Sequence, residues 1–594
     1  MRPHIVPVCD RCRRRKQKCD TELKPCSGCI SAGVECVMTD PETEEVVPRT
    51  YVLQLESHVA TLEKQLAEKR IHVQHSPCLP VHNLSATNIP ESVSVLPGSR
   101  YLGASSGFAF VESALRLAYK RGILESIPGE EEGDDVSTNM SKRHGFDDLL
   151  PVLQSPSIPE RPRMIELFDL YDEAQWQYLI LTESEFDAHL DAFYRMDPMD
   201  CPISAVVVYM VFAIAVQHVE RTDWNVAASN VASSYHQQAL GMVGLLLRHR
   251  SIESLQAILL VLVFSINNPQ KPIVWHLLGS AMRLASNLNL HIEPEDVSTR
   301  DISHRLFWSL YSMDRAIGNT LGRPTILEDG FITSTLPMRT PFGLGISLKE
   351  TRQREIAAHC FRIRQIQSEV ADTLYQKLRQ PSATFFADMQ TRLQEWHETI
   401  PPHAASAPHI LDWFHHSYFN VTMFIHRPSP VNPQPSTEHL NKCFEAAGEV
   451  LQFYSKIHSR GGFDATWMAV HWLFLAAITH LFCLWTDEDI RRAADWAKVN
   501  DAIQSTGMVL SAMTERWSSG RKMPEIYRKL SSGTLAKYTT IGRLEDKPTT
   551  PSQNLVWEEF QQQNAQLFSL DDMAMDFDMQ FWIDMQGSST GTTF

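Results

Sequence analysis

Apolar residues recur at helical spacing through most of the middle of the chain, from about Ile165 to Tyr538. Apolar positions at i, i+3, i+4 and i+7 predict one buried face of an α-helix. Turn signals such as Gly322-Arg323-Pro324 separate the runs, and no alternation of strands with helices is visible. The expected helices are Ala205–His218, Val231–Leu247, Leu255–Phe264, Trp275–Leu288, Ser303–Thr320, Glu350–Lys377, Leu411–Ile425, Leu440–Ile457 and Trp467–Trp485. We therefore expect one large all-α helical domain over residues 164–540.

Two runs within this region are apolar on every side, Ser204–Val216 and Trp467–Trp485. The second is just long enough to span a bilayer. It contains His471 and His480 and has no basic residue at its immediate ends. We interpret both runs as buried core helices and expect no membrane partner.

Residues 51–70 carry a narrower apolar seam with a spacing of three and four residues. This spacing is typical of the a and d positions of a short coiled coil. The seam residues are Val52, Leu55, Val59, Leu62 and Leu66. A coil of this length is marginal alone, and the alternative is an amphipathic helix packed on its own chain. We expect a dimerisation element that forms a homodimer.

Three segments have a polar pattern that predicts little ordered structure. Residues 41–50 are interpreted as a linker, and residues 71–163 as a mostly disordered linker with a short helix from Phe108 onward. The tail, residues 548–594, has no Lys or Arg and interleaves seven acidic residues with aromatic ones. Such alternation is typical of a disordered activation segment that coactivators bind. The alternative is a C-terminal helix docked on the core.

The charge of the chain is unevenly distributed. Its 594 residues carry 54 Lys and Arg and 70 Asp and Glu, a net charge of −16, which opposes nucleic-acid binding by the chain as a whole. Eleven cysteines are too few for a disulfide scaffold. Six of them, however, fall within the first 36 residues, where basic residues also gather. This N-terminal segment therefore needs its own interpretation.

The six cysteines have the spacing C-x2-C-x6-C-x6-C-x2-C-x6-C, two near-identical halves. Thiolates are ligands that suit zinc, and a structural metal can replace the core that this short segment lacks. Six ligands cannot fill two separate four-ligand sites, so two of them must bridge two zinc ions. The alternative is a set of three disulfides. The candidate ligands are Cys9, Cys12, Cys19, Cys26, Cys29 and Cys36.

Six basic residues lie between the first and third of these cysteines. A short basic helix held by metal can enter the major groove of DNA, where Arg and Lys donate to guanine and neutralise phosphates. A bland alternative is a solvated basic face or a nuclear-localisation signal. The candidate DNA-binding residues are Arg11, Arg13, Arg14, Arg15, Lys16 and Lys18.

The pattern from Cys9 to Cys36 resembles, without a gap, the fungal Zn(2)-Cys(6) binuclear zinc-cluster transcription factors. The resemblance implies a DNA-binding domain over residues 1–40 with two zinc ions. It implies that Cys9 and Cys26 bridge them, one zinc also taking Cys12 and Cys19 and the other Cys29 and Cys36. Pro25 matches the proline that the family places before the fourth cysteine.

The same resemblance implies which basic residues read DNA. Lys16 corresponds to the base-reading lysine, and family members typically read CGG triplets in double-stranded DNA, often as dimers. Arg15 is expected to help Lys16, and Arg13, Arg14 and Lys18 to contact phosphates. The resemblance also implies a nuclear location.

Two stretches, Trp275–His291 and His304–Pro337, resemble the fungal-specific transcription factor domain. This resemblance covers about Ile165–Leu336. We expect Asp314 and Arg315 to form a buried pair that fixes helix packing. The whole chain is interpreted as a transcription factor of RNA polymerase II genes, an activator of a metabolic or biosynthetic gene cluster, and not an enzyme. The alternatives are a protein-interaction scaffold and a hydrolase using Ser105 of the GASSG sequence.

Overall fold

The protein is described here from a computed structural model. Its described residues are 9–20, 25–34, 36–39, 46–48, 105–124, 158–222, 226–267, 274–337, 347–377, 380–460, 466–515, 520 and 522–540. The chain divides into two compact units, residues 1–89 and 90–594. The expected coiled coil at 51–70 and the expected activation tail at 548–594 lie outside the described residues, and both stay predictions.

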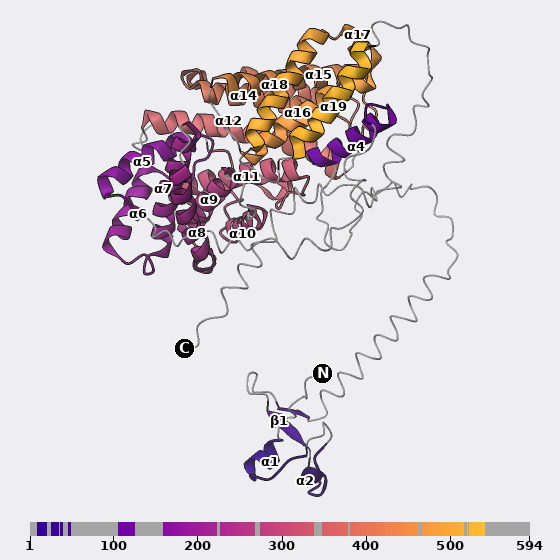
Figure 1. The fold of residues 1–594 in the computed structure, drawn as a ribbon. Coiled ribbons are helices and arrows are strands. Elements are labelled where there is room, and N and C mark those ends of the chain that lie inside the picture. Colours follow the sequence, from indigo (N-terminus) through magenta and orange to yellow (C-terminus); the bar gives the residue numbers. More distant parts are fainter. Residues whose placement is uncertain are drawn as a thin grey trace, which may run out of the picture. The chain divides into compact units, whose positions relative to one another are not determined.

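The first unit is small and is built around the cysteines (Figure 1). Its elements are helices α1 (Asp10–Arg14) and α2 (Ser27–Ile30) and strands β1 (Val37–Thr39) and β2 (Val46–Pro48). The strands pair antiparallel, with Val37 opposite Pro48 and Thr39 opposite Val46. The expected linker at 41–50 therefore overlaps a strand, because the β-branched residues Val37, Thr39, Val46 and Val47 favour two short extended segments that can pair.

All the regular elements among the described residues of the second unit are helices (Figure 1). Its elements are α4 (Gly107–Lys120), α5 (Arg161–Ala174), α6 (Glu183–Arg195), α7 (Pro202–Thr222), α8 (Val226–His249), α9 (Ile252–Asn267), α10 (Val274–Asn287), α11 (Val297–Leu321), η3 (Asp329–Phe331), α12 (Leu348–Ala371), η4 (Asp372–Gln376), α13 (Phe385–Glu398), η5 (Pro402–Ser406), α14 (Pro408–His426), α15 (Thr437–Ser459), α16 (Trp467–Thr486), α17 (Glu488–Ala493), α18 (Trp496–Thr514) and α19 (Lys522–Thr540).

Every helix named from the apolar pattern is present, most of them longer than expected, and the segment at 350–377 ends in the π-helical turn η4. The helices without a named prediction are the more polar α5, α6 and α13 and the C-terminal α17 to α19. Helix α6 begins with a capping box, in which Thr182 accepts from the Glu185 backbone N–H and the Glu185 side chain accepts from that of Thr182. That local signal was available in the sequence.

Most helices share one continuous core, and a second cluster of apolar side chains lies among α12, α13 and α14. Helices α9 and α16 are buried on nearly all sides; in α9 every residue from Ser254 to Ile266 is buried. Two helices, α7 and α16, are long and apolar enough to cross a membrane, but 72% and 83% of those segments are buried inside the protein. Their burial favours the interpretation as core helices.

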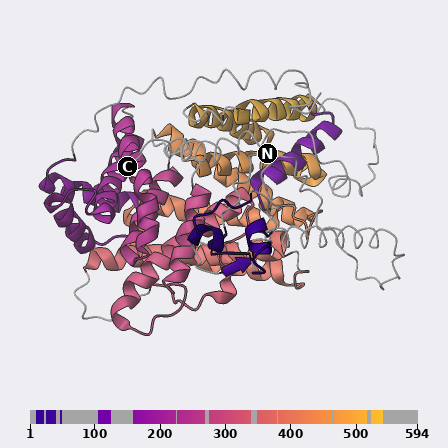
Figure 2. The ribbon, with the colours of Figure 1, turned by 90° about the horizontal axis from the view of Figure 1, so that it is seen from below.

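Helix α4 lies where a short helix was expected from Phe108 onward, within the predicted linker over residues 71–163. Its residues Val111, Ala114 and Leu115 are buried, and it packs against α16 in both views (Figures 1 and 2). The ring of Phe110 meets that of Phe482 edge to face with centroids 5.2 Å apart. Arg427, just after α14, donates to the Ser105 carbonyl at 2.6 Å. Residues 105–124 are thus part of the helical unit.

The C-terminal end of α4 rests on Gly533 of α19. A Cβ at Gly533 would lie 2.1 Å from the Ile123 carbonyl oxygen, which no real contact permits. We expect Gly533→Ala to destabilise the helical unit by about 1–3 kcal/mol, because a backbone atom must move. Gly507→Ala on neighbouring α18 is the matched control, since a Cβ there meets nothing within 4 Å. It is expected to stabilise by about 0.5–1 kcal/mol, as a helical Gly→Ala change does. Thermal unfolding of both variants checks the pair, and equal effects would contradict the close contact.

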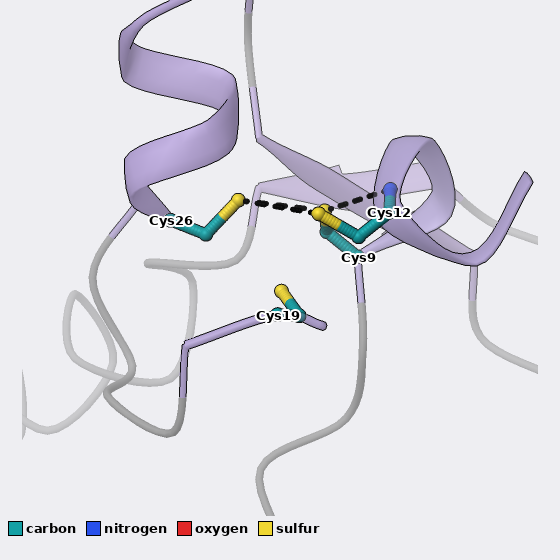
Figure 3. A group of neighbouring side chains, drawn as sticks. All are labelled: Cys9, Cys12, Cys19 and Cys26. Carbon is teal, nitrogen blue, oxygen red and sulfur yellow. Dashed lines mark hydrogen bonds between the residues drawn. The ribbon is translucent and has the colours of Figure 1, made fainter. Parts of the chain in front are cut away.

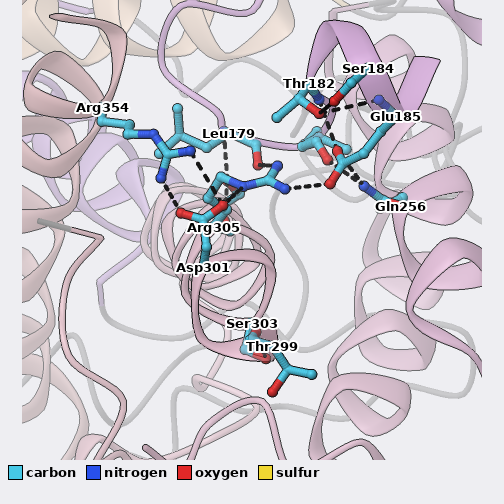
Figure 4. Close-up of polar contacts among 12 residues, drawn as sticks. Leu179, Thr182, Ser184, Glu185, Gln256, Thr299, Asp301, Ser303, Arg305 and Arg354 are labelled. Carbon is cyan, nitrogen blue, oxygen red and sulfur yellow. Dashed lines mark hydrogen bonds and ion pairs between the residues drawn. The ribbon is translucent and has the colours of Figure 1, made fainter. Parts of the chain in front are cut away.

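An ion-pair network with two buried arginines joins four helices (Figure 4). Arg305 on α11 donates to Asp301 at 2.9 Å, to Glu185 on α6 at 2.5 Å and to the Leu179 carbonyl at 3.2 Å. Arg354 on α12 binds the other side of Asp301, and Gln256 on α9 donates to Glu185 at 3.1 Å. Each charged group is therefore satisfied, and the network fixes how these helices pack.

The expected pair of Asp314 and Arg315 is confirmed and is wholly buried. Arg315 also donates to Asp329 at 2.6 Å, to the Leu327 carbonyl at 2.6 Å and to Ser368 on α12 at 3.2 Å. All its donor groups are used, so the pair connects α11 to η3 and α12.

Candidate metal centre and nucleic-acid interface

Two short helices position the cysteines in the same way. Cys9 occupies the N-cap position of α1 and Cys26 that of α2, with nearly equal backbone angles, although only the Cys9 side chain accepts a capping hydrogen bond. Cys12 and Cys29 lie three residues further on, in the first turn of each helix. A capping side chain faces that third residue, so the C-x2-C spacing brings two sulfurs together in each half. The backbone N–H of Cys12 donates to the Cys9 sulfur at 3.4 Å.

The six sulfurs form two groups of four. One group is Cys9, Cys12, Cys19 and Cys26, and the other is Cys9, Cys26, Cys29 and Cys36. In each group the four sulfur atoms lie within 4.8 Å of one another, and the groups share Cys9 and Cys26. Figure 3 shows the first group with its sulfurs turned toward one another. None of the six cysteines is in a disulfide.

The sulfur separations fit tetrahedral zinc. The distance is 3.8 Å from Cys9 to Cys26, 3.7 Å from Cys9 to Cys29 and 3.6 Å from Cys12 to Cys26. A zinc ion with Zn–S bonds of about 2.3 Å and tetrahedral angles places its sulfurs about 3.8 Å apart. A disulfide would need sulfurs about 2.05 Å apart. The residues present therefore fit two zinc ions with two shared ligands.

The shared cysteines ionise most readily. Burial opposes ionisation of Cys26, but the backbone N–H of Cys29 and the neighbouring thiols outweigh it and lower its pKa to about 6. The pKa of Cys9 is lowered against burial in the same way by Cys12 and Cys29. By contrast, burial and the bond to Cys26 raise the pKa of Cys29 to about 12. Thiolate is the form that binds metal, so the two shared positions favour it before the outer ones.

Lys16 occupies an unusual backbone position. Its φ angle is +51°, in the left-handed region that favours glycine. It lies just after α1, where the Lys16 N–H bonds to the Arg13 carbonyl at 3.3 Å and the Gln17 N–H to the Cys12 carbonyl at 3.0 Å. This is the Schellman arrangement that ends many helices, usually with glycine at this position.

The second half of the unit has glycine at the corresponding place. Gly33 follows Cys29 by four residues, as Lys16 follows Cys12, and its φ is +62°. The N–H groups of Gly33 and Val34 repeat the two hydrogen bonds, to Ile30 at 3.0 Å and to Cys29 at 3.2 Å. The first half thus keeps a lysine where the geometry favours glycine, at a cost of about 1–3 kcal/mol. Such strain points to a function for the side chain.

The other basic residues surround this position. Arg13, Arg14, Arg15, Lys16 and Lys18 are all exposed, so they form a cationic surface at the C-terminal end of α1. Arg11 differs, because it is half-buried and donates to the Gly28 carbonyl of α2. It joins the two halves of the unit, and a DNA contact by Arg11 stays a prediction.

Asp20 is a residue that the sequence analysis passed over. Its carboxylate accepts from the Ser27 backbone N–H at 2.5 Å and from the Ser27 hydroxyl at 3.1 Å. It therefore satisfies the N-terminus of α2 and ties the loop after Cys19 to the second half. In the sequence, an acidic residue beside a basic run suggests only that it offsets the basic charge. The fold is needed to show that Asp20 contacts Ser27.

Two known domains match the chain. Residues 7–45 match the fungal Zn(2)-Cys(6) binuclear cluster domain, and residues 171–398 match the fungal specific transcription factor domain. These domains define the class of fungal zinc-cluster transcription regulators. The chain carries both domains, whose families are transcription regulators and not enzymes, and a Zn(2)-Cys(6) cluster domain binds two zinc ions.

Its relatives are fungal regulators of transcription. The positive regulator of purine utilization from Emericella nidulans is 24% identical, over 89% of this chain and 69% of the relative. An ABC-transporter-regulating transcription factor from Aspergillus oryzae is 22% identical, over 86% of this chain and 71% of the relative. The transcriptional activator protein acu-15 from Neurospora crassa is 25% identical, over 67% of this chain and 47% of the relative.

The hydrolase alternative finds no support at Ser105. Its side chain is 1% exposed, so no substrate reaches it, and its carbonyl is held by Arg427. Ser105 lies two residues before α4, which packs in the helical unit.

Proposed function

We propose that this protein is a nuclear transcription activator that binds paired CGG-type half-sites in double-stranded DNA as a homodimer. Cys9, Cys12, Cys19 and Cys26 hold one zinc ion, and Cys29 and Cys36 hold the second together with the shared Cys9 and Cys26. The metals hold α1 rigid, so the basic side chains at its end meet the major groove as one surface. Residues 51–70 pair two chains, and the acidic tail recruits coactivators.

The observation that carries the DNA-binding proposal is Lys16 at the glycine-favouring position. The strained backbone sets the lysine at the exposed end of α1, beside Arg13 and Arg15. Lys16 donates to guanine there, Arg15 helps it, and Arg13, Arg14 and Lys18 neutralise phosphates.

The genes under control are proposed to be metabolic. The names of the relatives cited above include a regulator of purine utilization, which supports a role in nutrient or biosynthetic pathways. The tail composition supports activation over repression.

Selection of bound sequences from random DNA by the full-length, zinc-loaded protein tests this function. We expect enrichment of two CGG triplets at a fixed spacing, at a stated near-physiological salt concentration. A single triplet would keep the DNA-binding role and remove the dimer. No enriched sequence from protein that retains its zinc would refute it and favour a protein-interaction scaffold.

The Lys16 side chain can be removed in two ways that separate its roles. We expect Lys16→Ala and Lys16→Gly both to lose about 1–3 kcal/mol of preference for CGG over other sequences. Only the glycine variant relieves the left-handed strain, so it is expected to be more stable than the alanine variant. Lys18→Ala, at an exposed phosphate-contact position, is the control and should weaken all sequences alike. Retained sequence preference in both Lys16 variants would contradict the assignment.

A further inference from the structure

A cavity of about 70 Å³ lies inside the helical unit, where the start of α4 meets α11, α12, α14 and α16. A water needs about 10–15 Å³ of such space, so there is room for about five waters or one small ligand. Phe424, Trp472 and Leu475 form part of its wall. Its polar lining consists mainly of Ser105, Asn319, Arg364, Gln367, Asn420 and Arg427.

Arg364 of α12 brings a buried cation to this cavity, and no carboxylate among the described residues pairs with it. It is 4% exposed, and it donates to the Gln367 side chain at 2.7 Å. Its Nε has no hydrogen-bond partner, and none of the ion pairs in the described part of the chain includes it. Burial lowers its pKa. A buried charge without a partner is expensive, and folded proteins rarely keep one.

Arg427, after α14, is a second such cation on the same cavity. It is 2% exposed and donates to the Tyr375 hydroxyl at 3.1 Å and to the Ser105 carbonyl at 2.6 Å. Its guanidinium lies 5.1 Å from the centre of the Phe424 ring. These partners are neutral, and no carboxylate among the described residues pairs with Arg427.

The other buried arginines of the unit make the contrast. Arg305, Arg315 and Arg354 are equally buried, and each is paired with at least one carboxylate. The fold therefore neutralises buried arginines elsewhere. The two exceptions, Arg364 and Arg427, line the same cavity.

Neutral hydrogen-bonding groups in the cavity also lack partners. Both amide atoms of Asn319 and the Ser105 hydroxyl are buried without a hydrogen bond. Buried polar atoms are nearly always satisfied, and those that are not call for a water or a ligand. Together with the two guanidinium groups they would surround an acceptor-rich molecule.

We propose that this cavity binds a small organic anion bearing a carboxylate, held between Arg364 and Arg427. A carboxylate matches the planar fork of guanidinium with two parallel hydrogen bonds, which a point charge does not. The small volume excludes nucleotides, and the Trp472 and Leu475 side chains suit a short apolar portion. This site goes beyond the proposed DNA-binding function and does not depend on it.

Titration of the full-length, zinc-loaded protein with simple carboxylates tests the site. The probes are sodium formate, acetate, lactate and succinate, and the controls at equal ionic strength are sodium chloride, acetamide and succinamide. We expect at least one carboxylate to raise the unfolding temperature saturably and to bind in calorimetry, whereas the amides and chloride do neither. The proposal would be overturned if none of the carboxylates bound saturably. It would also be overturned if inorganic phosphate raised the unfolding temperature as much as the best carboxylate.

Two variants on α12 locate the binding. Arg364→Met removes the buried charge and keeps the side-chain length; Arg362→Met changes an exposed arginine two residues away. We expect Arg364→Met to raise the dissociation constant of the bound carboxylate at least tenfold. In the absence of any carboxylate, this variant should unfold at or above the wild-type temperature. Arg362→Met should bind like wild type. Unchanged carboxylate binding by Arg364→Met, or lower stability of that variant without ligand, would place Arg364 among structural residues and refute the site.

Discussion

Cys26→Ser is expected to release both zinc ions and to abolish sequence-specific DNA binding. Cys26 belongs to both groups of four sulfurs, so its loss leaves each group with three thiols. Structural zinc contributes about 10–16 kcal/mol to the folding of small metal-dependent units, and this unit has little other core. We expect binding to fall to the non-specific level, about a thousandfold weaker or more.

Two matched variants sharpen this test. Cys29→Ser removes a sulfur from only one group, so we expect it to keep more zinc than Cys26→Ser. Cys443→Ser changes a buried cysteine of the helical unit and should leave both zinc ions and DNA binding intact. Zinc per chain, measured by elemental analysis, separates the three. Two zinc ions retained by Cys26→Ser would refute its bridging role.

The sequence predicts the composition of the metal centre better than its shape. Spacing alone indicates that six thiols serve two metals and that two of them are shared, because the count requires it. It does not indicate that Cys9 and Cys26 occupy the N-cap positions of two helices with nearly equal backbone angles. Nor does it reveal the strain at Lys16. The glycine preference of that position becomes apparent only when the backbone angles of Lys16 are compared with those of Gly33, its counterpart in the second half.

In the helical unit, the predictability of an element follows its apolar content. Helices α9 and α16 are apolar on all sides and were predicted within a few residues. Helix α4 was expected as a short helix from Phe108 onward, but the polar segments flanking it gave no sign that it packs in the core. The cavity could not be predicted at all. From sequence alone, an arginine is expected on the surface. Only the packing shows that Arg364 and Arg427 are buried and that no carboxylate among the described residues pairs with them.

Arg315→Leu is expected to destabilise the helical unit by about 3–5 kcal/mol, because it leaves Asp314 buried without its cation. Asp314→Asn combined with Arg315→Leu should recover much of this loss, since the neutral amide can still accept from the Ile326 N–H, which now bonds to Asp314 at 3.4 Å. Arg352→Leu, on the exposed face of α12, is the control and should change stability by less than about 0.5 kcal/mol. Chemical unfolding followed by circular dichroism compares the three.

The pH dependence of Arg315→Leu distinguishes an unpaired charge from a simple packing defect. Burial raises the pKa of Asp314 even though Arg315 lowers it, so removing Arg315 raises that pKa further. A carboxyl whose pKa is higher in the folded than in the unfolded chain favours folding while it is protonated, and this contribution is lost as the pH rises through the folded pKa. The deficit of the variant should therefore be smallest under acidic conditions and grow toward alkaline ones. A deficit that is constant with pH would mean that lost packing, and not the stranded carboxylate, destabilises the variant.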